Sequence, residues 1–180
     1  FDDGSTASFG WDRKFERLYE DEFEIRDGIV IPLGDYEWDS WQMSYESDQS
    51  KKVSFTGGVQ TGGFWGGDRD RYTAGLQLNP TYKFQTELNV TRNQVDLPQG
   101  DFTVDLVGAR INYSFSKRMF LNALIQYDSD SEEMLSNIRF NFMPKPLSDL
   151  YIVYNERRDL EDNEVLDRAI TLKLTWVFPL

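Results

Sequence analysis

The stretch from Ala169 to Phe178, AITLKLTWVF, decides the fold class of this 180-residue chain. Every second residue from Ile170 to Phe178 is apolar, and the residues between them are mostly small or polar. Successive side chains of a β-strand point to opposite sides, so the stretch predicts a strand with one apolar and one polar face. Its length also matches the about 9–11 residues that a tilted strand needs to cross a bilayer.

The same alternation recurs upstream and gives about nine strand-length segments in all. The eight earlier segments are 36–46, 53–61, 72–78, 82–90, 107–115, 119–127, 134–142 and 150–155. We therefore expect an all-β fold, an antiparallel up-and-down transmembrane β-barrel with about 9–10 strands in this chain, and we place the barrel strands in residues 36–180. A soluble β-sandwich produces the same alternation and is the structural alternative.

The connections between the segments separate these two folds. Short ones (47–51, 79–81, 116–118 and 144–148) alternate with longer ones (62–70, 93–101, 128–133 and 156–166). Outer-membrane barrels have short periplasmic turns and longer outer loops, whereas a sandwich has no reason to alternate in this way. The pattern favours the barrel, with the longer loops outside.

Residues 1–35 are expected to be an extracellular segment or a partial strand. Single-chain bacterial barrels usually have an even number of strands, so nine segments leave two alternatives. A tenth strand lies within residues 5–33, where the run from Phe23 to Ile31 is apolar but contains Gly28 and is followed by Pro32. Otherwise the chain is the C-terminal part of a larger barrel, which is the alternative we favour.

Composition excludes many functions. The chain has no cysteine and no histidine, which removes disulfides, thiolate metal sites and histidine-dependent catalytic triads. A net charge of -12 argues against nucleic acid as a partner. We predict no catalytic residue, cofactor or specific metal site. Acidic residues are concentrated in the longer loops, where divalent cations are possible partners that would bridge to lipid headgroups, although solvated loops are the simpler and favoured explanation.

Two sets of side chains fit the interior and the rim of a barrel. The predicted lumen-lining charges sit among Asn and Gln, and would either pair with each other or bias a water channel toward anions; they are Lys83, Glu87, Arg110, Arg139 and Lys173. Aromatic residues near the strand ends suit the headgroup level of a membrane. The predicted girdle comprises Trp38, Tyr82, Tyr113, Phe115, Tyr127, Tyr154, Trp176 and Phe178.

Three stretches resemble a family of bacterial outer-membrane proteins of unassigned function: 124–129 (LIQYDS), 137–142 (NIRFNF) and 148–156 (SDLYIVYNE). Residues 23–25 (FEI) and 31–36 (IPLGDY) also fit the family. Members typically join an N-terminal carbohydrate-binding-like β-sandwich to a C-terminal barrel, and some are loosely labelled membrane-associated hydrolases. The resemblance implies an outer-membrane location and an upstream portion outside this chain. It supplies no catalytic residues.

The resulting hypothesis is a non-enzymatic outer-membrane barrel that acts as a pore, an anchor or a scaffold, in contact with outer-membrane lipid. Two alternatives remain. Unpaired strand edges recruit other strands, so copies of the chain would pair into an extracellular multi-chain barrel or tube. The other alternative is a secreted sugar-binding β-sandwich.

Overall fold

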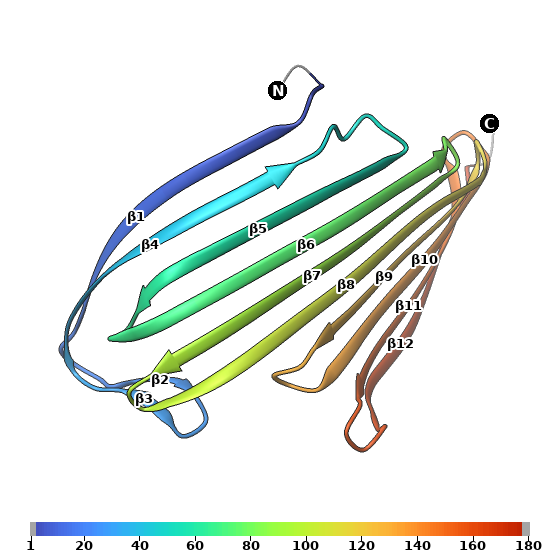
Figure 1. Ribbon diagram of the computed structural model, residues 1–180. Helices are drawn as coiled ribbons and strands as arrows, with labels where there is room; N and C mark the ends of the chain where they lie inside the picture. The colour runs from blue at the N-terminus through green and yellow to red at the C-terminus, as the bar shows by residue number, and fades with distance from the viewer. Residues whose placement is uncertain (1–2, 178–180) are drawn as a thin grey trace. The chain divides into compact units, whose positions relative to one another are not determined.

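A computed structural model describes residues 3–177, which form β-strands joined by turns and short loops (Figure 1). The strands are β1 (Thr6–Leu18), β2 (Phe23–Arg26), β3 (Ile29–Ile31), β4 (Gly34–Glu46), β5 (Val53–Phe64), β6 (Gly67–Thr81), β7 (Phe84–Leu97), β8 (Gly100–Ser116), β9 (Met119–Asp128), β10 (Glu133–Lys145), β11 (Ser148–Asp159) and β12 (Val165–Thr175). Among residues 3–177, no helix is long and apolar enough to cross a membrane.

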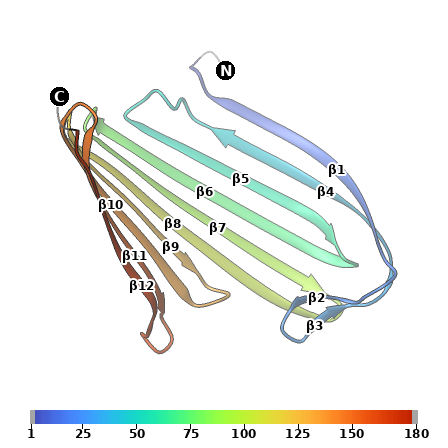
Figure 2. The ribbon, with the colours of Figure 1, turned by 180° about the vertical axis from the view of Figure 1, so that it is seen from behind.

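Ten strands form one sheet in the order β1-β4-β5-β6-β7-β8-β9-β10-β11-β12, and β2 pairs only with β3. Apart from the step from β1 to β4, each strand is followed in the sheet by the next strand in the chain (Figures 1 and 2). This order confirms the all-β, antiparallel, up-and-down class. It also differs from the Greek-key order that is typical of a sandwich.

The tenth strand of the sheet is β1, which lies within residues 5–33 as predicted, but upstream of the apolar run from Phe23 to Ile31. It pairs with β4 along its whole length, from Thr6 opposite Glu46 to Leu18 opposite Gly34. Its alternation is hidden because charged residues interrupt the apolar face. Arg13 and Arg17 lie on the same face as Phe9, where their neighbours on β4 are acidic, and β1 therefore remains a regular strand.

Two of the four longer loops that we predicted are mostly strand. Segments 62–70 and 93–101 contain only the two-residue turns 65–66 and 98–99. Trp65 and Gly66 both have positive φ, 51° and 87°, as a type I′ hairpin turn requires, and this turn matches the twist of the flanking strands. The alternation of loop lengths is therefore wrong at these positions. The strand order and the segregation of the two faces are stronger arguments for a barrel.

The chain divides into two compact units. Unit 1 contains the described residues up to 48, with 56–74 and 91–104; unit 2 contains 49–55, 75–90 and the described residues from 105. In unit 1 the apolar run from Phe23 to Ile31 forms the β2–β3 hairpin and supplies the buried residue Ile31. Unit 2 consists mainly of β9 to β12 with the adjoining halves of neighbouring strands.

We expect Gly62→Ala to destabilise unit 1. Gly62 has φ +148°, and a Cβ atom there would lie 2.3 Å from the Asp39 carbonyl oxygen and 2.6 Å from Ser40 Cα. Backbone atoms cannot yield as a flexible side chain does, so we expect a loss of about 1–3 kcal/mol. Gly108→Ala is the control, because a Cβ there meets nothing within 4 Å. Urea unfolding followed by tryptophan fluorescence measures both; equal midpoints would contradict this prediction.

Candidate functional site: the two faces of the sheet and the inner hairpin

Unit 2 has one apolar face and one polar face, set by the register of its strands. Ile138 pairs with Tyr154, and Tyr154 pairs with Ile170, which makes an apolar row across β10, β11 and β12. The next residue of β11, Asn155, pairs with Asn137 of β10, and these two side chains lie on the opposite face. Further apolar-face residues are Val107, Ala109, Ile111, Tyr113, Leu121, Ala123, Ile125, Tyr127, Phe140, Phe142, Leu150, Ile152, Leu172 and Leu174.

Side-chain amides hydrogen-bond to each other along the polar face. The Asn122 amide donates to Asn112 across β8 and β9 at 2.7 Å, and the Asn137 amide donates to Asn155 across β10 and β11. Amides with two donors and two acceptor sites keep further hydrogen-bonding capacity for water or a polar solute. The polar face of unit 2 is therefore a hydrophilic surface.

Of the five predicted lumen-lining charges, Glu87 and Arg110 form one pair. The Arg110 Nη1 atom lies 3.5 Å from Glu87 Oε2, and the Asn89 amide donates to the same carboxylate at 2.9 Å. The pair is partly exposed and carries no net charge, so it contributes polarity and no ion preference. Lys83 lies in the turn that follows β6, with its Nζ atom 5.8 Å from the centre of the Tyr82 ring.

Arg139 and Lys173 lie on either side of Tyr151 on the polar face. The Arg139 guanidinium carbon is 5.5 Å from the centre of the Tyr151 ring, and Tyr151 is the cross-strand partner of Lys173. Neither cation forms an ion pair with a carboxylate of residues 3–177. The two positive charges are therefore uncompensated, and they flank the Tyr151 ring, which lies near the start of β11 beside the end of β12.

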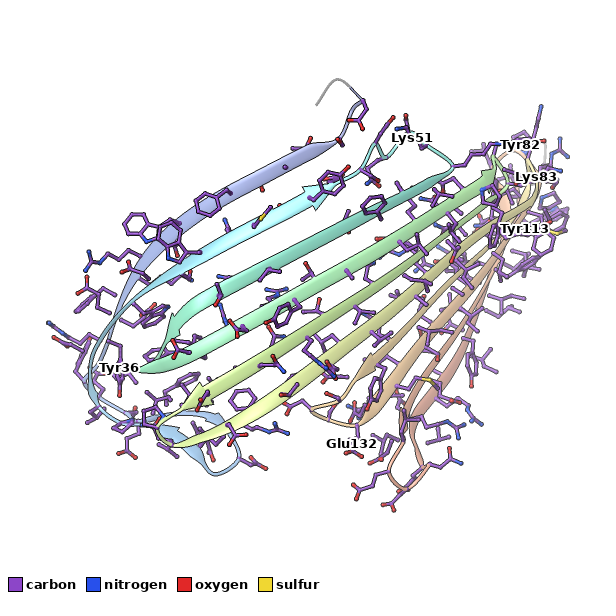
Figure 3. The ribbon with its side chains drawn as sticks, in the orientation of Figure 1. Tyr36, Lys51, Tyr82, Lys83, Tyr113 and Glu132 are labelled. Carbon is purple, nitrogen blue, oxygen red and sulfur yellow. The ribbon has the colours of Figure 1, made fainter. Side chains whose placement is uncertain are left out.

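The predicted girdle aromatics lie at both ends of the strands of unit 2. Tyr82, Tyr113, Phe115 and Trp176 are near the turn ends, and the Tyr113 and Phe115 rings contact each other edge-on with centroids 4.6 Å apart. Figure 3 shows Tyr82, Lys83 and Tyr113 together at one end and Glu132 at the other. Tyr127 and Tyr154 are on the apolar face toward that second end. Trp176 lies beneath Lys145, with Nζ 4.4 Å from its ring.

The two remaining girdle predictions differ. Trp38 lies on β4 in unit 1, on the face opposite to the exposed apolar residues, and Phe178 is outside the described residues. On β4, Trp41 and Met43 share the apolar face with Phe9 of β1, whereas Trp38 is on the opposite side. There it contacts Phe64 edge-on and Trp65 at a centroid distance of 5.3 Å. We therefore do not retain Trp38 among the girdle aromatics.

The β2–β3 hairpin packs on the inner side of unit 1, on the face opposite to Trp41. Ile31 is fully buried and packs with Val95 and Leu97, which are 5% exposed. Partly buried residues surround this core: Leu18, Ile25, Ile29, Tyr36, Phe64, Trp65 and Phe102. The hairpin is thus fixed by apolar contacts to the ends of strands of the main sheet, and Figures 1 and 2 both show it beside the ends of β7 and β8.

Trp65 joins the β5–β6 turn to this hairpin. Its ring lies 5.7 Å from the Phe23 ring and 5.2 Å from the Tyr36 ring. A positive φ is unusual for a large side chain, and Asn is the ordinary residue at this turn position. Since the backbone would be more relaxed with Asn, the contacts of the Trp65 ring explain why tryptophan is tolerated there. The guanidinium carbon of neighbouring Arg69 lies 4.5 Å from the centre of the Phe64 ring.

An ion cluster caps the apolar face of unit 2, beyond the row of Tyr154. The Glu156 side chain is only 9% exposed; Arg168 Nη2 lies 2.6 Å from its Oε2 atom, and the Arg158 Nε atom donates to its Oε1 at 3.0 Å. The Tyr154 hydroxyl donates to Glu156 as well. Hydrogen bonds from Tyr154, Arg168 and Arg158, in that order of effect, lower the pKa of Glu156 from 4.5 to about 2.

This low pKa predicts an acid-sensitive contribution to stability. A depressed carboxylate pKa stabilises the fold above its ordinary value of 4.5, and the contribution disappears as the pH falls through the folded value of about 2. Glu156→Gln should therefore make the unfolding midpoint less dependent on pH between pH 4.5 and 2. Urea titrations of both proteins across that window test it. Parallel pH profiles would show that Glu156 makes no such contribution.

Acidic side chains gather at strand ends of unit 1. Asp68, Asp70, Asp96 and Asp101 line a shallow hollow with Gln94, Val95, Phe102 and Thr103. Across residues 3–177, no three carboxylates are placed to hold a metal ion. Divalent cations at the acidic loops therefore stay a prediction.

The sequence predicted the two faces of the sheet, but it did not predict the packing of the β2–β3 hairpin or the Glu156 cluster.

Comparisons with known proteins add little. No protein-family model matches the sequence, and no curated protein matches it. Among solved structures, the chain is similar to a KdgM porin in complex with disordered oligogalacturonate, with 10% identity and a TM-score of 0.39 over 97% of this chain and 96% of that chain. This similarity is too low to assign a function.

Proposed function

We propose that the chain is an outer-membrane β-barrel protein without enzymatic activity, whose polar face encloses a narrow passage for small anions. The observation that carries this proposal is the segregation of the two faces. Large apolar side chains on one face are mostly uncovered by other parts of the protein: Ile170 is 71% and Phe9 72% exposed. An apolar surface of this extent on a monomer marks a membrane or a partner. The opposite face carries amides and charges, as the wet interior of a barrel does.

The number of strands supports closure within one chain. The main sheet has ten strands, β1 and β4 to β12, and neighbours are antiparallel, so β1 and β12 run in opposite directions. Antiparallel closure requires this arrangement, and an even number of strands produces it. The two strands pair on one side only in the described residues, and their backbone groups cannot remain unpaired in a bilayer. We infer that β1 pairs with β12 in the membrane.

Cysteine cross-linking tests this closure directly, because the natural chain contains no cysteine. Ser8→Cys or Asp12→Cys in β1, each combined with Ala169→Cys or Thr171→Cys in β12, samples the register. In detergent, we expect at least one pair to form an intramolecular disulfide that changes the gel mobility of the monomer. Ser8→Cys combined with Ser114→Cys, in the middle of the sheet order, is the control that should not cross-link.

The competing outcome is specific. Open strand edges also favour pairing between copies. Disulfides only between chains, together with a particle that is large and stable without detergent, would replace our proposal with the self-assembling alternative. A monomer that stays soluble without detergent would favour a soluble sugar-binding protein. Conductance in planar bilayers then separates a passage from an anchor or scaffold.

The inner hairpin defines how narrow the proposed passage is. In a closed barrel the β2–β3 hairpin lies on the lumen side, at the end of the strands that carries the β5–β6 and β7–β8 turns. Its contacts with Val95, Leu97 and Trp65 hold it in place. The lumen of a small barrel is narrow, so a hairpin of this size inside it restricts passage to small solutes.

A further inference from the structure

We propose that Arg158 and Arg168 form a binding site for the phosphate group of an anionic membrane lipid. The inference rests on the proposed function, because it takes the apolar face of unit 2 as the surface that meets lipid. Both arginines are on that face. Arg158 is paired with Met134 on β10, and Arg168 is paired with Glu156 on β11.

Their position matches the level of lipid headgroups. Along β11, Leu150, Ile152 and Tyr154 form the apolar row, and Glu156 and Arg158 follow at the next two positions on the same side. Tyrosines are common where apolar chains give way to headgroups, and Tyr154 marks this boundary. The guanidinium groups of Arg158 and Arg168 lie two to four residues beyond the boundary at Tyr154. This is the level at which the phosphate of a lipid headgroup would lie.

Glu156 organises the site without neutralising it. Its buried carboxylate binds Arg168 through Nε and Nη2 and binds Arg158 through Nε. Arg158 Nη1 also donates to Asn163 in the loop that follows β11. These contacts leave Nη1 of Arg168 and Nη2 of Arg158 as donors, and the cluster keeps a net charge of +1. Planar guanidinium groups bind phosphate oxygens with two parallel hydrogen bonds, and Glu156 acts as a positioning residue.

The surrounding charge decides between a lipid phosphate and a free one. Beyond the arginines, the loop carries Glu161, Asp162 and Glu164, all exposed, and the chain has a net charge of -12. A dissolved anion approaching from solution meets this negative field first. A lipid arrives along the apolar face, where its chains contact Ile152 and Ile170, and its headgroup then reaches the arginines without crossing the loop. We therefore assign the site to a lipid headgroup.

The test uses the whole chain in detergent micelles and counts retained lipids by native mass spectrometry. The probes are phosphatidylglycerol, whose phosphate carries the net charge, phosphatidylcholine, which is zwitterionic, and inorganic phosphate alone. We expect the wild type to prefer phosphatidylglycerol, and Arg158→Gln combined with Arg168→Gln to weaken its retention by at least about tenfold. Arg157→Gln is the matched control, since Arg157 faces the polar side opposite Asp167.

Each other outcome overturns the inference. Equal retention by the wild type and the double variant, or an equal loss with Arg157→Gln, would mean that the cluster does not bind lipid. Inorganic phosphate binding as tightly as phosphatidylglycerol would show a free-anion site. These failures are separate from failure of the proposed function, in which the wild type would need no detergent and would not cross-link between β1 and β12.

Discussion

Ile31→Asp is expected to release the β2–β3 hairpin and to raise the single-channel conductance of the protein several-fold. Ile31 is fully buried between the hairpin and the strand ends that carry Val95 and Leu97. A carboxylate there would lie among the apolar side chains of the hairpin core, and burying a charge among apolar groups costs several kcal/mol or more. The main sheet has its own backbone pairing, so the hairpin should detach while the strands persist. Conductance in planar bilayers gives the readout.

Two further variants make the result specific to the hairpin. Ile31→Val keeps an apolar side chain, costs about 0.5–1.5 kcal/mol, and should leave conductance near the wild-type value. Trp65→Asn suits the positive φ of the type I′ turn but removes the ring that contacts Phe23 and Tyr36. It should loosen the hairpin without unfolding β5 and β6. Protease cleavage between residues 19 and 33 reports release; a released hairpin with unchanged conductance would show that it does not restrict the passage.

Most of the sheet could be predicted from the sequence because a strand has a period of two residues and its two faces differ in polarity. The segments 107–115, 119–127 and 134–142 all lie within strands of the structure. The same physics explains the failure at β1, where Arg13 and Arg17 stand on the apolar face and are matched by Glu37 and Asp35 on β4. Such cross-strand compensation is visible only when the partner strand is known.

The site was less accessible to sequence reasoning than the sheet. A period-two pattern placed Arg139 and Lys173 on the polar face, but not on either side of Tyr151. The run from Phe23 to Ile31 was recognised as apolar, yet its packing against Val95 and Leu97 depends on contacts between distant parts of the chain. Glu156 was assigned to a loop. The signal that was available is that Glu156, Arg158 and Tyr154 are spaced two residues apart, which places them on one side of a strand.

Replacing Arg139 and Lys173 with glutamate should reverse the ion preference of the passage from anions to cations. In the wild type neither of these cations forms an ion pair with a carboxylate of residues 3–177, whereas Arg110 is neutralised by Glu87. In a narrow passage a fixed charge is poorly screened, so it attracts counter-ions and repels ions of its own sign. The double substitution changes the local charge by four units, from +2 to -2. Basic side chains line anion pores and acidic side chains line cation pores, so the sign of the preference should change.

The reversal potential under a salt gradient measures this preference, and its sign should change in the double variant. Arg157→Glu is a control of the same kind, since Arg157 faces the same polar side but lies at the loop end of β11, away from Tyr151 near the start of that strand. It should shift the potential only slightly. A neutral variant, Arg139→Gln with Lys173→Gln, should fall between the two extremes. If all three variants keep the wild-type potential while still conducting, the ions do not pass along the face of Tyr151, and the passage must be placed elsewhere.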